Sequence, residues 1–333
     1  MIRPLAVSLG DPAGVGPELI AACWAERATL DLPPFAVVGS RSVLEKAGRS
    51  RRLDVPTRTI VSLADADEVF GEALPVIELD QKVDVALGRP DPAGARLALA
   101  SLEEATRLVR TAEASALVTL PIAKGLLAEI GFAYPGQTEF LAARCDQPSE
   151  NAVMMLAGPQ LRAVPITVHC ALSQVSDKLN SALIEHKARI VHAALQTDFG
   201  IAHPRLAVAG LNPHAGENGR MGREEMDIIA PAIARLRGSG IDATGPYAGD
   251  ALFTPRARKT YDAAIAMYHD QALIPLKALD FDEGVNVTLG LPIVRTSPDH
   301  GTAFDIAGKG KADPGATAAA LTMAAQCARR RGA

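Results

Sequence analysis

Short apolar runs alternate along the chain with longer stretches in which apolar residues recur at the spacing of a helix. The clearest runs read LAVSLG (5–10), FAVVGS (35–40), ALVTLP (116–121), RLAVAGLNP (205–213) and AAIAMYH (263–269). Such runs, separated by helical stretches, are typical of strands in a parallel or mixed sheet that helices cover. The pattern therefore predicts an α/β protein.

Three of the helical stretches have recognisable ends. The stretch at 91–114 opens with Asp91 as cap and Pro92 in the first turn, and its leucines fall near one face. A second stretch stops at the glycines of 238–240. The last ends in the arginines of 329–331, which suit the negative end of a helix dipole. We expect helices at all three places.

One segment departs from this alternation. Residues 152–170 contain two apolar runs separated by Gly-Pro-Gln, which predicts an antiparallel hairpin or a short turn within a mixed sheet. No internal repeat or obvious linker interrupts the chain, so composition indicates no domain boundary.

The composition excludes several classes of partner. The 333 residues carry 34 basic and 38 acidic side chains, a net charge of −4, so we expect neither nucleic acid nor an anionic membrane surface as partner. The opening apolar run breaks at Gly10 and no other run is long enough to span a bilayer, so we expect neither a signal peptide nor a membrane segment. Four scattered cysteines without a CxxC pair suit reduced thiols and a cytoplasmic protein.

Three of the seven histidines lie where a strand gives way to a loop. His169 ends the run AVPITV, His214 follows LAVAGLNP, and His269 ends AAIAMY. Ligands of open α/β sheets collect at the carboxyl edge of the strands, and neutral imidazoles suit zinc and related ions. The three histidines are therefore candidate ligands of one divalent metal, with packed or solvated imidazoles as the alternative.

Three strong hydrogen-bond donors follow the third histidine. Lys277, Asn286 and Arg295 lie in a segment that is otherwise apolar enough for a core. Arginine offers a planar fork and lysine a point charge, a combination that suits a compact dianion such as phosphate. Surface salt bridges or turn contacts are the alternative for each of them.

The segment HGTAFDIAGKGKADP (300–314) is rich in glycine and charge. It is not a Walker loop, and GDPAGVGPE (10–18) does not have the spacing of a dinucleotide-binding fingerprint. By itself, the segment at 300–314 could simply be a turn before the last helix. A glycine-rich backbone also allows close approach of an adenine and its ribose.

Longer motifs identify a family. The chain resembles the 4-hydroxythreonine-4-phosphate dehydrogenases of vitamin B6 biosynthesis from end to end. The similarity lies in SLGDPAGVGPE (8–18), YPGQTEFLA (134–142), VHCALSQV (168–175), GLNPHAGENGRMGREE (210–225), YHDQALIPLK (268–277) and GVNVTLGLPIVRTSPDHGTAFDIAGKGKADP (284–314). The loop at 300–314 is also similar to the HGSAPDIAGKG-type segment of isocitrate and isopropylmalate dehydrogenases, which receives the adenosine end of the coenzyme.

The resemblance implies a fold and an assembly. We expect an isocitrate/isopropylmalate dehydrogenase-like α/β/α fold with mixed sheets in two lobes and a cleft between them. The lobes are expected to be discontinuous in the chain, one formed by 1–125 plus 246–333 and the other by 126–245. The family also implies a homodimer with the active site at the subunit interface.

The resemblance further implies an activity. The family oxidises 4-(phosphooxy)-L-threonine with NAD or NADP to 2-amino-3-oxo-4-(phosphooxy)butanoate, which decarboxylates to 3-amino-2-oxopropyl phosphate. It uses one divalent metal per subunit, and we expect zinc, magnesium or cobalt here. A metal lowers the pKa of the hydroxyl group, the nicotinamide accepts the hydride, and binding of the distant phosphate orients the substrate.

Family roles pass to this chain position by position. The metal ligands match His169, His214 and His269; the substrate contacts match Gln137, Thr138, Lys277, Asn286 and Arg295; the catalytic side chains match Asp250 and Lys277; and the coenzyme loop matches His300, Gly301, Thr302, Ala303 and Asp305.

Gln137 departs from the family pattern, which commonly has histidine at this position. Glutamine donates a hydrogen bond but carries no proton at neutral pH, so another 4-phosphorylated sugar acid, D-erythronate or D-threonate 4-phosphate, is the nearest alternative substrate. The phosphate donors argue against ring dihydrodiols. A metal-dependent phosphatase or hydrolase would also use three imidazoles and an anion site, but not the loop at 300–314. A phosphate-binding protein without enzymatic activity would need neither metal nor dinucleotide.

Overall fold

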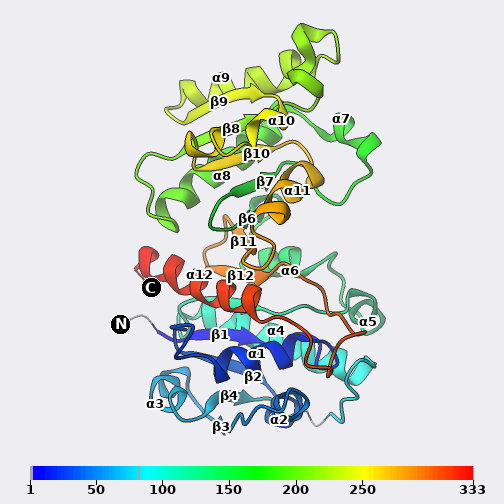
Figure 1. Cartoon of the computed structure of the whole chain (residues 1–333), viewed down its shortest axis with the longest axis vertical. Coiled ribbons are helices and arrows are strands. Elements are labelled where there is room, and N and C mark those ends of the chain that lie inside the picture. Colours follow the sequence, from blue (N-terminus) through cyan, green and yellow to red (C-terminus); the bar gives the residue numbers. More distant parts are fainter. Residues whose placement is uncertain (1–2, 82, 333) are drawn as a thin grey trace. The chain divides into compact units, whose positions relative to one another are not determined.

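The computed structural model describes residues 3–81 and 83–332. The chain forms two compact units (Figure 1). The first contains residues 1–149 and 291–333, and the second contains residues 150–290. The chain therefore leaves the first unit once and returns to it.

Strands and helices alternate in the first unit, as the apolar runs predict. Its strands are β1 (Leu5–Ser8), β2 (Phe35–Gly39), β3 (Thr57–Thr59), β4 (Leu74–Glu78), β5 (Leu117–Thr119) and β12 (Arg295–Pro298). Its helices are α1 (Gly16–Ala25), α2 (Arg41–Ser50), α3 (Ala66–Phe70), α4 (Pro92–Arg110), α5 (Lys124–Glu129), α6 (Gln137–Arg144) and α12 (Gly315–Arg331). The strands follow the order β3-β4-β2-β1-β5-β12, and the pairings between them are parallel.

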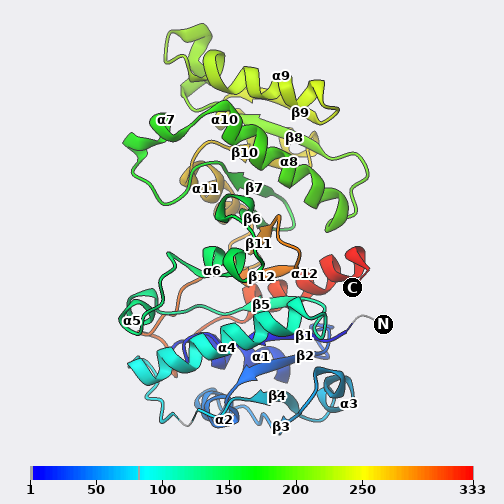
Figure 2. The same cartoon turned by 180° about the vertical axis from the view of Figure 1, so that it is seen from behind.

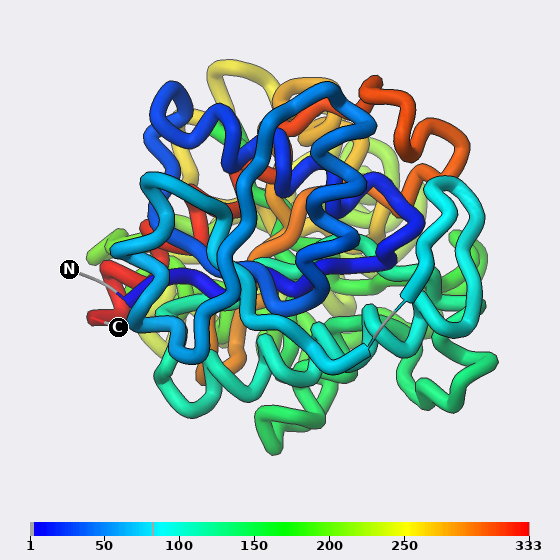
Figure 3. The backbone as a smooth tube through the Cα atoms, turned by 90° about the horizontal axis from the view of Figure 1, so that it is seen from below, coloured from blue at the N-terminus to red at the C-terminus, as the bar shows by residue number. Residues whose placement is uncertain are grey.

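Helices cover both faces of this parallel sheet. Helices α1 and α12 lie on one face (Figure 1), and α4 lies on the other (Figure 2). Figure 3 views the unit from its β3 side, with the blue and light-blue segments that carry α2, β3 and β4 in front. Because both faces are covered, β1 and β2 are buried at every position and have continuous rather than alternating apolar sequences.

The second unit contains both antiparallel and parallel strand pairs. Its strands are β6 (Val153–Ala157), β7 (Arg162–Pro165), β8 (Arg205–Ala209), β9 (Asp242–Tyr247), β10 (Ala263–Ala266) and β11 (Val285–Leu289). Its helices are α7 (Val175–Lys178), α8 (Ser181–Thr197), α9 (Ala230–Gly238), α10 (Gly249–Leu252) and α11 (His269–Leu279), with a π-helical turn at Glu225–Ile229 before α9. The strand order is β11-β6-β7-β10-β8-β9.

Among the strands described in this unit, only β6 runs opposite to the rest. Strand β6 is antiparallel to both β11 and β7, whereas β7, β10, β8 and β9 run parallel. Helix α11 covers one face of the sheet (Figure 1), and α8 and α9 cover the other (Figure 2). The parallel part therefore has a single carboxyl edge, from which several loops emerge.

The structure confirms the elements that the sequence pattern predicts. All five apolar runs contain strands, and residues 152–170 contain the antiparallel hairpin β6–β7. Helix α4 begins as expected, with the Asp91 carboxylate accepting a hydrogen bond from the Gly94 amide at 2.7 Å. None of the helices described is both long enough and apolar enough to cross a bilayer.

The unit boundaries lie at other residues than the expected ranges 1–125 plus 246–333 and 126–245. Residues up to 290 belong to the second unit because β10 pairs with β7 and β8, and β11 pairs with β6. Residues 126–149, which include α6, belong to the first unit. These boundaries depend on pairing between strands that are far apart in the chain. The local amino-acid composition does not indicate that pairing.

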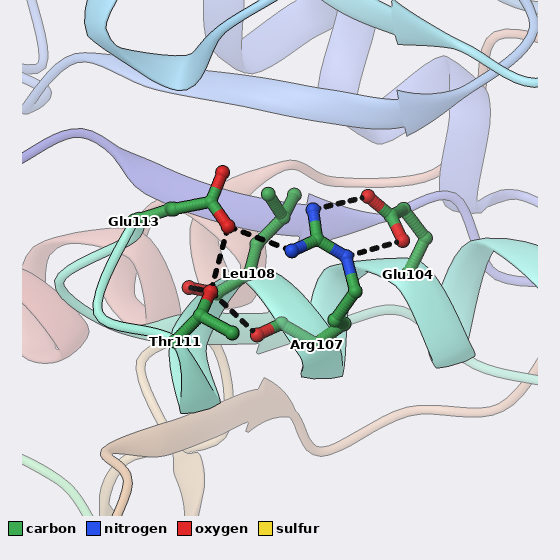
Figure 4. A network of polar contacts seen from close by, with 5 residues as sticks. All are labelled: Glu104, Arg107, Leu108, Thr111 and Glu113. Atoms are coloured by element: carbon green, nitrogen blue, oxygen red, sulfur yellow. Dashed lines mark hydrogen bonds and ion pairs between the residues drawn. The ribbon is translucent and has the colours of Figure 1, made fainter.

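A network of polar side chains lies at the carboxyl end of α4 (Figure 4). Arg107 donates two hydrogen bonds to Glu104, at 2.7 and 2.9 Å, and one to Glu113 at 2.7 Å. The Thr111 hydroxyl donates to the same Glu113 carboxylate at 2.7 Å. The hydrogen bonds from Arg107 and Thr111 hold the pKa of Glu113 below its usual range. Because the network is exposed, its ion pairs contribute little to stability.

A buried hydroxyl joins α4 to the sheet. Ser101 is fully buried; its Oγ accepts a hydrogen bond from the Leu9 amide at 2.8 Å and donates one to the Val38 carbonyl at 2.6 Å. The side chain therefore satisfies one backbone group at the end of β1 and another in β2.

We predict that Ser101→Ala lowers the free energy of unfolding by about 1–3 kcal/mol, because two buried backbone groups lose their partner. Urea denaturation followed by circular dichroism measures the change. Arg96→Ala, at an exposed position on α4, is the matched control and should change the free energy of unfolding by less than about 0.5 kcal/mol. Equal unfolding curves for both variants would contradict the prediction.

Candidate active site

The second unit brings three strand-end histidines to one edge of its sheet. His169 lies beyond the end of β7, His214 beyond β8, and His269 beyond β10. Strand β10 is hydrogen-bonded in parallel to β7 on one side and to β8 on the other. The three loops consequently emerge next to one another at the carboxyl edge, which is where open α/β sheets bind ligands.

His169 and His269 face each other across a cavity of about 260 Å³. Their ring centroids are 6.0 Å apart. The Asp270 carboxylate lies 2.7 Å from Nδ1 of His269. A carboxylate at Nδ1 fixes the tautomer of an imidazole and leaves Nε2 as the nitrogen available to a metal.

His214 lines a neighbouring cavity of about 580 Å³. Asp250, the first-turn acidic residue of α10, lines this cavity too. Tyr268 and Asp270 line both cavities, so the two are adjacent. The structure therefore brings two of the predicted ligands together and places the third in the next cavity, beside the predicted catalytic aspartate.

Two of the histidines have unusual backbone conformations. His169 has a φ of 49° and His214 a φ of 51°, both in the left-handed region that disfavours side chains with a Cβ atom. Residues kept in this region cluster at functional sites, where the surrounding structure holds them in place. The strain therefore supports a functional role for both loops.

The chemistry of these donors suits a divalent transition metal. Imidazoles that share one zinc ion, with Zn–N bonds of about 2.0 Å, have ring centroids roughly 5 Å apart, close to the separation of His169 and His269. Across residues 3–81 and 83–332, however, no group of three or more histidine, cysteine or acidic side chains is arranged to hold a metal ion. The pair and its carboxylate match the chemistry of a metal site, while His214 does not join them at one point.

The predicted phosphate donors of the second unit lie on α11 and β11. Lys277 is in the last turn of α11, and Asn286 is the second residue of β11. Oδ1 of Asn286 is buried and has no hydrogen-bond partner. An unsatisfied buried amide oxygen is costly in a folded protein, and it could accept a hydrogen bond from a donor group of a ligand.

Arg295 is the predicted phosphate donor of the first unit. Its side chain is buried and donates to Oγ1 of Thr119 at 2.7 and 3.1 Å and to Oε1 of Gln137 at 3.3 Å. Burial lowers the pKa of the Arg295 guanidinium to about 10, and Glu139 acts in the opposite direction. The group is therefore still protonated at neutral pH. Thr138 follows Gln137 in the first turn of α6 and is half-buried.

Gln137 has a structural role at its position. Its Nε2 donates to the Leu120 carbonyl at 3.0 Å while its Oε1 accepts from Arg295. The amide thus fixes the guanidinium between the end of β5 and the start of α6. A glutamine meets this double requirement of donor and acceptor without a change of protonation.

The predicted coenzyme loop, residues 300–305, packs against the loop that precedes α1. The Thr302 carbonyl accepts a hydrogen bond from the Val15 amide at 2.9 Å. Ala303 has a φ of 43°, again in the left-handed region. Nε2 of His300 is buried without a hydrogen-bond partner. The loop is therefore constrained, and it carries a polar atom with no internal acceptor or donor.

A buried carboxylate holds the continuation of this loop. Oε2 of Glu18, in α1, accepts a hydrogen bond from the Gly308 amide at 2.9 Å, and Arg51 lies 3.7 Å from its Oε1. Arg51 also donates to the Ala312 carbonyl at 2.7 Å. Burial raises the pKa of Glu18, against the opposing effects of the Gly308 hydrogen bond and Arg51.

A larger cavity in the first unit is lined by none of the predicted site residues. It measures about 880 Å³ and lies along the exposed face of α4. Of its arginines, Arg107, Arg110 and Arg144 are ion-paired with Glu104, Asp146 and Glu103. Because their charges are compensated, size alone does not make this cavity the active site.

Residues 31–324 match the family model described as pyridoxal phosphate biosynthetic protein PdxA. This chain belongs to the PdxA family. It is 62% identical to the 4-hydroxythreonine-4-phosphate dehydrogenase of Erythrobacter litoralis, over 99% of this chain and 98% of the relative. It is 51% identical to the enzyme of that name from Zymomonas mobilis, over 99% and 97%.

Solved structures of PdxA-family proteins share the fold. The crystal structure of 4-hydroxythreonine-4-phosphate dehydrogenase from Klebsiella pneumoniae matches with a TM-score of 0.88 and 38% identity, over 98% of both chains. This likeness, together with the helix-covered sheets, confirms the expected α/β fold. The range that matches the family model includes every predicted site residue.

Several site neighbours are not evident from sequence alone. Thr119, Gln271 and Glu225 hold predicted site residues or their loops, and the sequence pattern does not point to any of the three. Thr119 and Gln271 lie close to strand ends, as the histidines do, and this signal could have found them. Glu225 lies within a helical stretch, and no local pattern distinguishes it.

We predict that Glu18→Ala lowers hydrogen-exchange protection of the Gly308 amide, because that amide loses its buried acceptor. Amide exchange followed by mass spectrometry or NMR measures the change over residues 300–312. Glu26→Ala, an exposed position just after α1, is the control and should leave the same amides protected. Unchanged protection in Glu18→Ala would show that other contacts hold the loop.

Proposed function

We propose that this protein oxidises 4-(phosphooxy)-L-threonine, with NAD or NADP, to 2-amino-3-oxo-4-(phosphooxy)butanoate in pyridoxal 5′-phosphate biosynthesis. The observation that carries the proposal is the 62% identity, over almost the full length of both chains, to the Erythrobacter litoralis 4-hydroxythreonine-4-phosphate dehydrogenase. The arrangement of side chains within each unit supports it.

The substrate phosphate is assigned to Arg295, Lys277 and Asn286. Arg295 is a buried cation that remains charged at neutral pH, and the Nδ2 group of Asn286 is a hydrogen-bond donor. Gln137 orients Arg295, and Thr138 follows it on α6. Binding energy at a phosphate remote from the reacting carbon fixes the orientation of the substrate.

His169, His214 and His269 are assigned to a divalent metal, with zinc, magnesium and cobalt as candidates. The facing rings of His169 and His269 and the Asp270 carboxylate support this assignment. When bound there, the metal would lower the pKa of the substrate hydroxyl. Its histidine ligands would have to be neutral to bind it, so binding should weaken as the pH falls.

The oxidation removes a hydride from the carbon that carries the hydroxyl group and a proton from the hydroxyl oxygen. A bound nicotinamide coenzyme would supply the hydride acceptor. Asp250, which shares a cavity with His214, and Lys277 are assigned to catalysis, and either can take part in moving this proton. The β-keto acid then loses carbon dioxide and leaves 3-amino-2-oxopropyl phosphate.

The coenzyme is assigned to the loop formed by His300, Gly301, Thr302, Ala303 and Asp305. Its contact with Val15 and the buried, unpartnered nitrogen of His300 support this role. The Asp305 carboxylate and the Thr302 hydroxyl offer acceptors for ribose hydroxyl groups.

We further propose a cytoplasmic homodimer whose active site lies at the subunit interface. Large apolar side chains are exposed beside the histidines: Leu172 lines the cavity of His169 and is 70% exposed, and Ile274 lines that of His214 and is 65% exposed. Exposed apolar groups around polar cavities are typical of protein interfaces. A second subunit would cover them.

Gln137 supports a second candidate substrate. Its amide is engaged by Arg295 and Leu120, and it cannot supply the proton that a histidine at this position could supply. The alternative substrate is therefore another 4-phosphorylated sugar acid, D-erythronate 4-phosphate or D-threonate 4-phosphate.

One assay distinguishes these proposals. Purified protein is incubated with zinc, magnesium or cobalt and NAD or NADP, and with 4-(phosphooxy)-L-threonine or D-erythronate 4-phosphate, while absorbance of the reduced nicotinamide is followed. We expect reduction with phosphothreonine and none for His214→Ala, which should retain its fold by circular dichroism. Release of inorganic phosphate without reduction would favour a phosphatase and overturn the proposal.

We predict that Arg295→Lys raises KM for the phosphorylated substrate at least tenfold with a smaller effect on kcat, because lysine lacks the planar fork of the guanidinium. Steady-state kinetics at neutral pH measure both constants. Arg189→Lys, an exposed position on α8, serves as the control. An unchanged KM in Arg295→Lys would remove this residue from the phosphate site.

A further inference from the structure

We infer that Glu225 is a positioning residue that holds His214 in place through Asn212. The inference rests on the proposed function, because it gives His214 the role of a metal ligand. Glu225 belongs to the π-helical turn Glu225–Ile229, and its side chain is buried. π-Helical turns occur frequently at functional sites.

The Glu225 carboxylate binds Asn212 at two points. Its Oε1 accepts a hydrogen bond from the Asn212 backbone amide at 2.7 Å, and its Oε2 accepts from Nδ2 of the same residue at 3.0 Å. The neighbouring Glu224 accepts from Nδ2 as well, at 2.7 Å. Asn212 is therefore fixed in both backbone and side chain two residues before His214.

The segment that follows has a conformation that needs such support. His214, Ala215, Gly216, Glu217 and Asn218 all have φ between 42° and 74°, which makes a left-handed turn. Four of these residues carry a Cβ atom, and a left-handed turn places each Cβ too close to the backbone. A run of this kind persists only where surrounding contacts impose it.

Two glycines of the loop allow the carboxylate to approach. A Cβ atom at Gly216 would lie 2.5 Å from Oε2 of Glu225, and one at Gly210 would lie 3.0 Å from its Oε1. The side chain thus occupies space that any larger residue at Gly216 would take. The two glycines and the carboxylate that they accommodate all belong to the motif GLNPHAGENGRMGREE (210–225).

The start of the loop is tied to the helix that begins with His269. Gln271, in α11, donates to the Gly210 carbonyl at 2.8 Å and accepts from the Met267 amide at 2.6 Å. The side chain therefore links the end of β8 to the end of β10. Glu225 and Gln271 together restrict the His214 loop on both sides of Leu211.

The expected effect is on metal affinity. Removal of groups that orient metal ligands typically weakens metal binding 10–100-fold. Glu225→Ala should therefore raise the Kd for Zn²⁺ by at least tenfold. Glu225→Gln keeps one acceptor for the Asn212 amide but faces Nδ2 with a second donor, so its loss should be smaller.

The experiment uses the full chain after metal removal with EDTA. Zn²⁺ is titrated by calorimetry into the wild-type protein, Glu225→Ala, Glu225→Gln and His214→Ala, and thermal unfolding of each apoprotein is recorded. Co²⁺ absorption spectra report the coordination of the bound ion. Asp227→Asn is the matched control, because its carboxylate lies in the same π-helical turn but is exposed and binds Arg223 at 2.9 Å.

We expect weaker Zn²⁺ binding and an altered Co²⁺ spectrum in Glu225→Ala, with Asp227→Asn like the wild type. A Glu225→Ala protein with a lower melting temperature but unchanged Zn²⁺ affinity and Co²⁺ spectrum would overturn the inference, since Glu225 would then act on stability alone. If Glu225→Ala does not fold, the Zn²⁺ affinities and Co²⁺ spectra of Glu225→Gln and Gln271→Ala test the inference by the same criterion.

The outcomes separate this inference from the proposed function. A wild-type protein that binds neither ion would refute the metal assignment itself. A wild-type protein that binds Zn²⁺ and depends on His214, while the Glu225 and Gln271 variants bind it equally well, would refute only the positioning role.

Discussion

The parallel pairing of β10 with β7 and β8 is the constraint on which the candidate site depends. Parallel neighbours end at the same edge of a sheet, so the loops after these three strands emerge together. His169, His214 and His269 are far apart in sequence and become neighbours only through this pairing. An antiparallel strand among the three would send one histidine to the opposite edge.

Strand order brings the loops together, but it does not fix their shape. Two of the candidate loops are held by polar side chains from other elements: Glu225 and the half-buried Gln271 hold the His214 loop, and Glu18 holds the loop at 300–312. The loops include residues in the left-handed region, which a free chain would leave. Buried hydrogen bonds offset this strain because a buried carboxylate or amide is costly to leave unsatisfied.

Arg295 is a buried cation and a candidate for binding the anion that we propose. Its side chain donates hydrogen bonds to the neutral oxygens of Thr119 and Gln137, and Glu139 favours its charged form. Burial lowers its pKa to about 10, still far above neutrality. The arginines along α4 differ, because carboxylates neutralise Arg107, Arg110 and Arg144. Arg295 is therefore buried and its anion site is a proposal, whereas the arginines along α4 form an exposed network of ion pairs.

The sequence by itself determined the strands in the five apolar runs, the cap of α4, the β6–β7 hairpin, the strand-end position of the three histidines and, through its long motifs, the family. These features depend on local periodicity and on residues close together in the chain. Only the tertiary structure decided that residues up to 290 remain in the second unit, that His169 faces His269 while His214 lies in the next cavity, and that Glu225 and Thr119 support the site. Such choices depend on strand order and on contacts between residues far apart in the chain, which hydrophobic spacing along the sequence does not record.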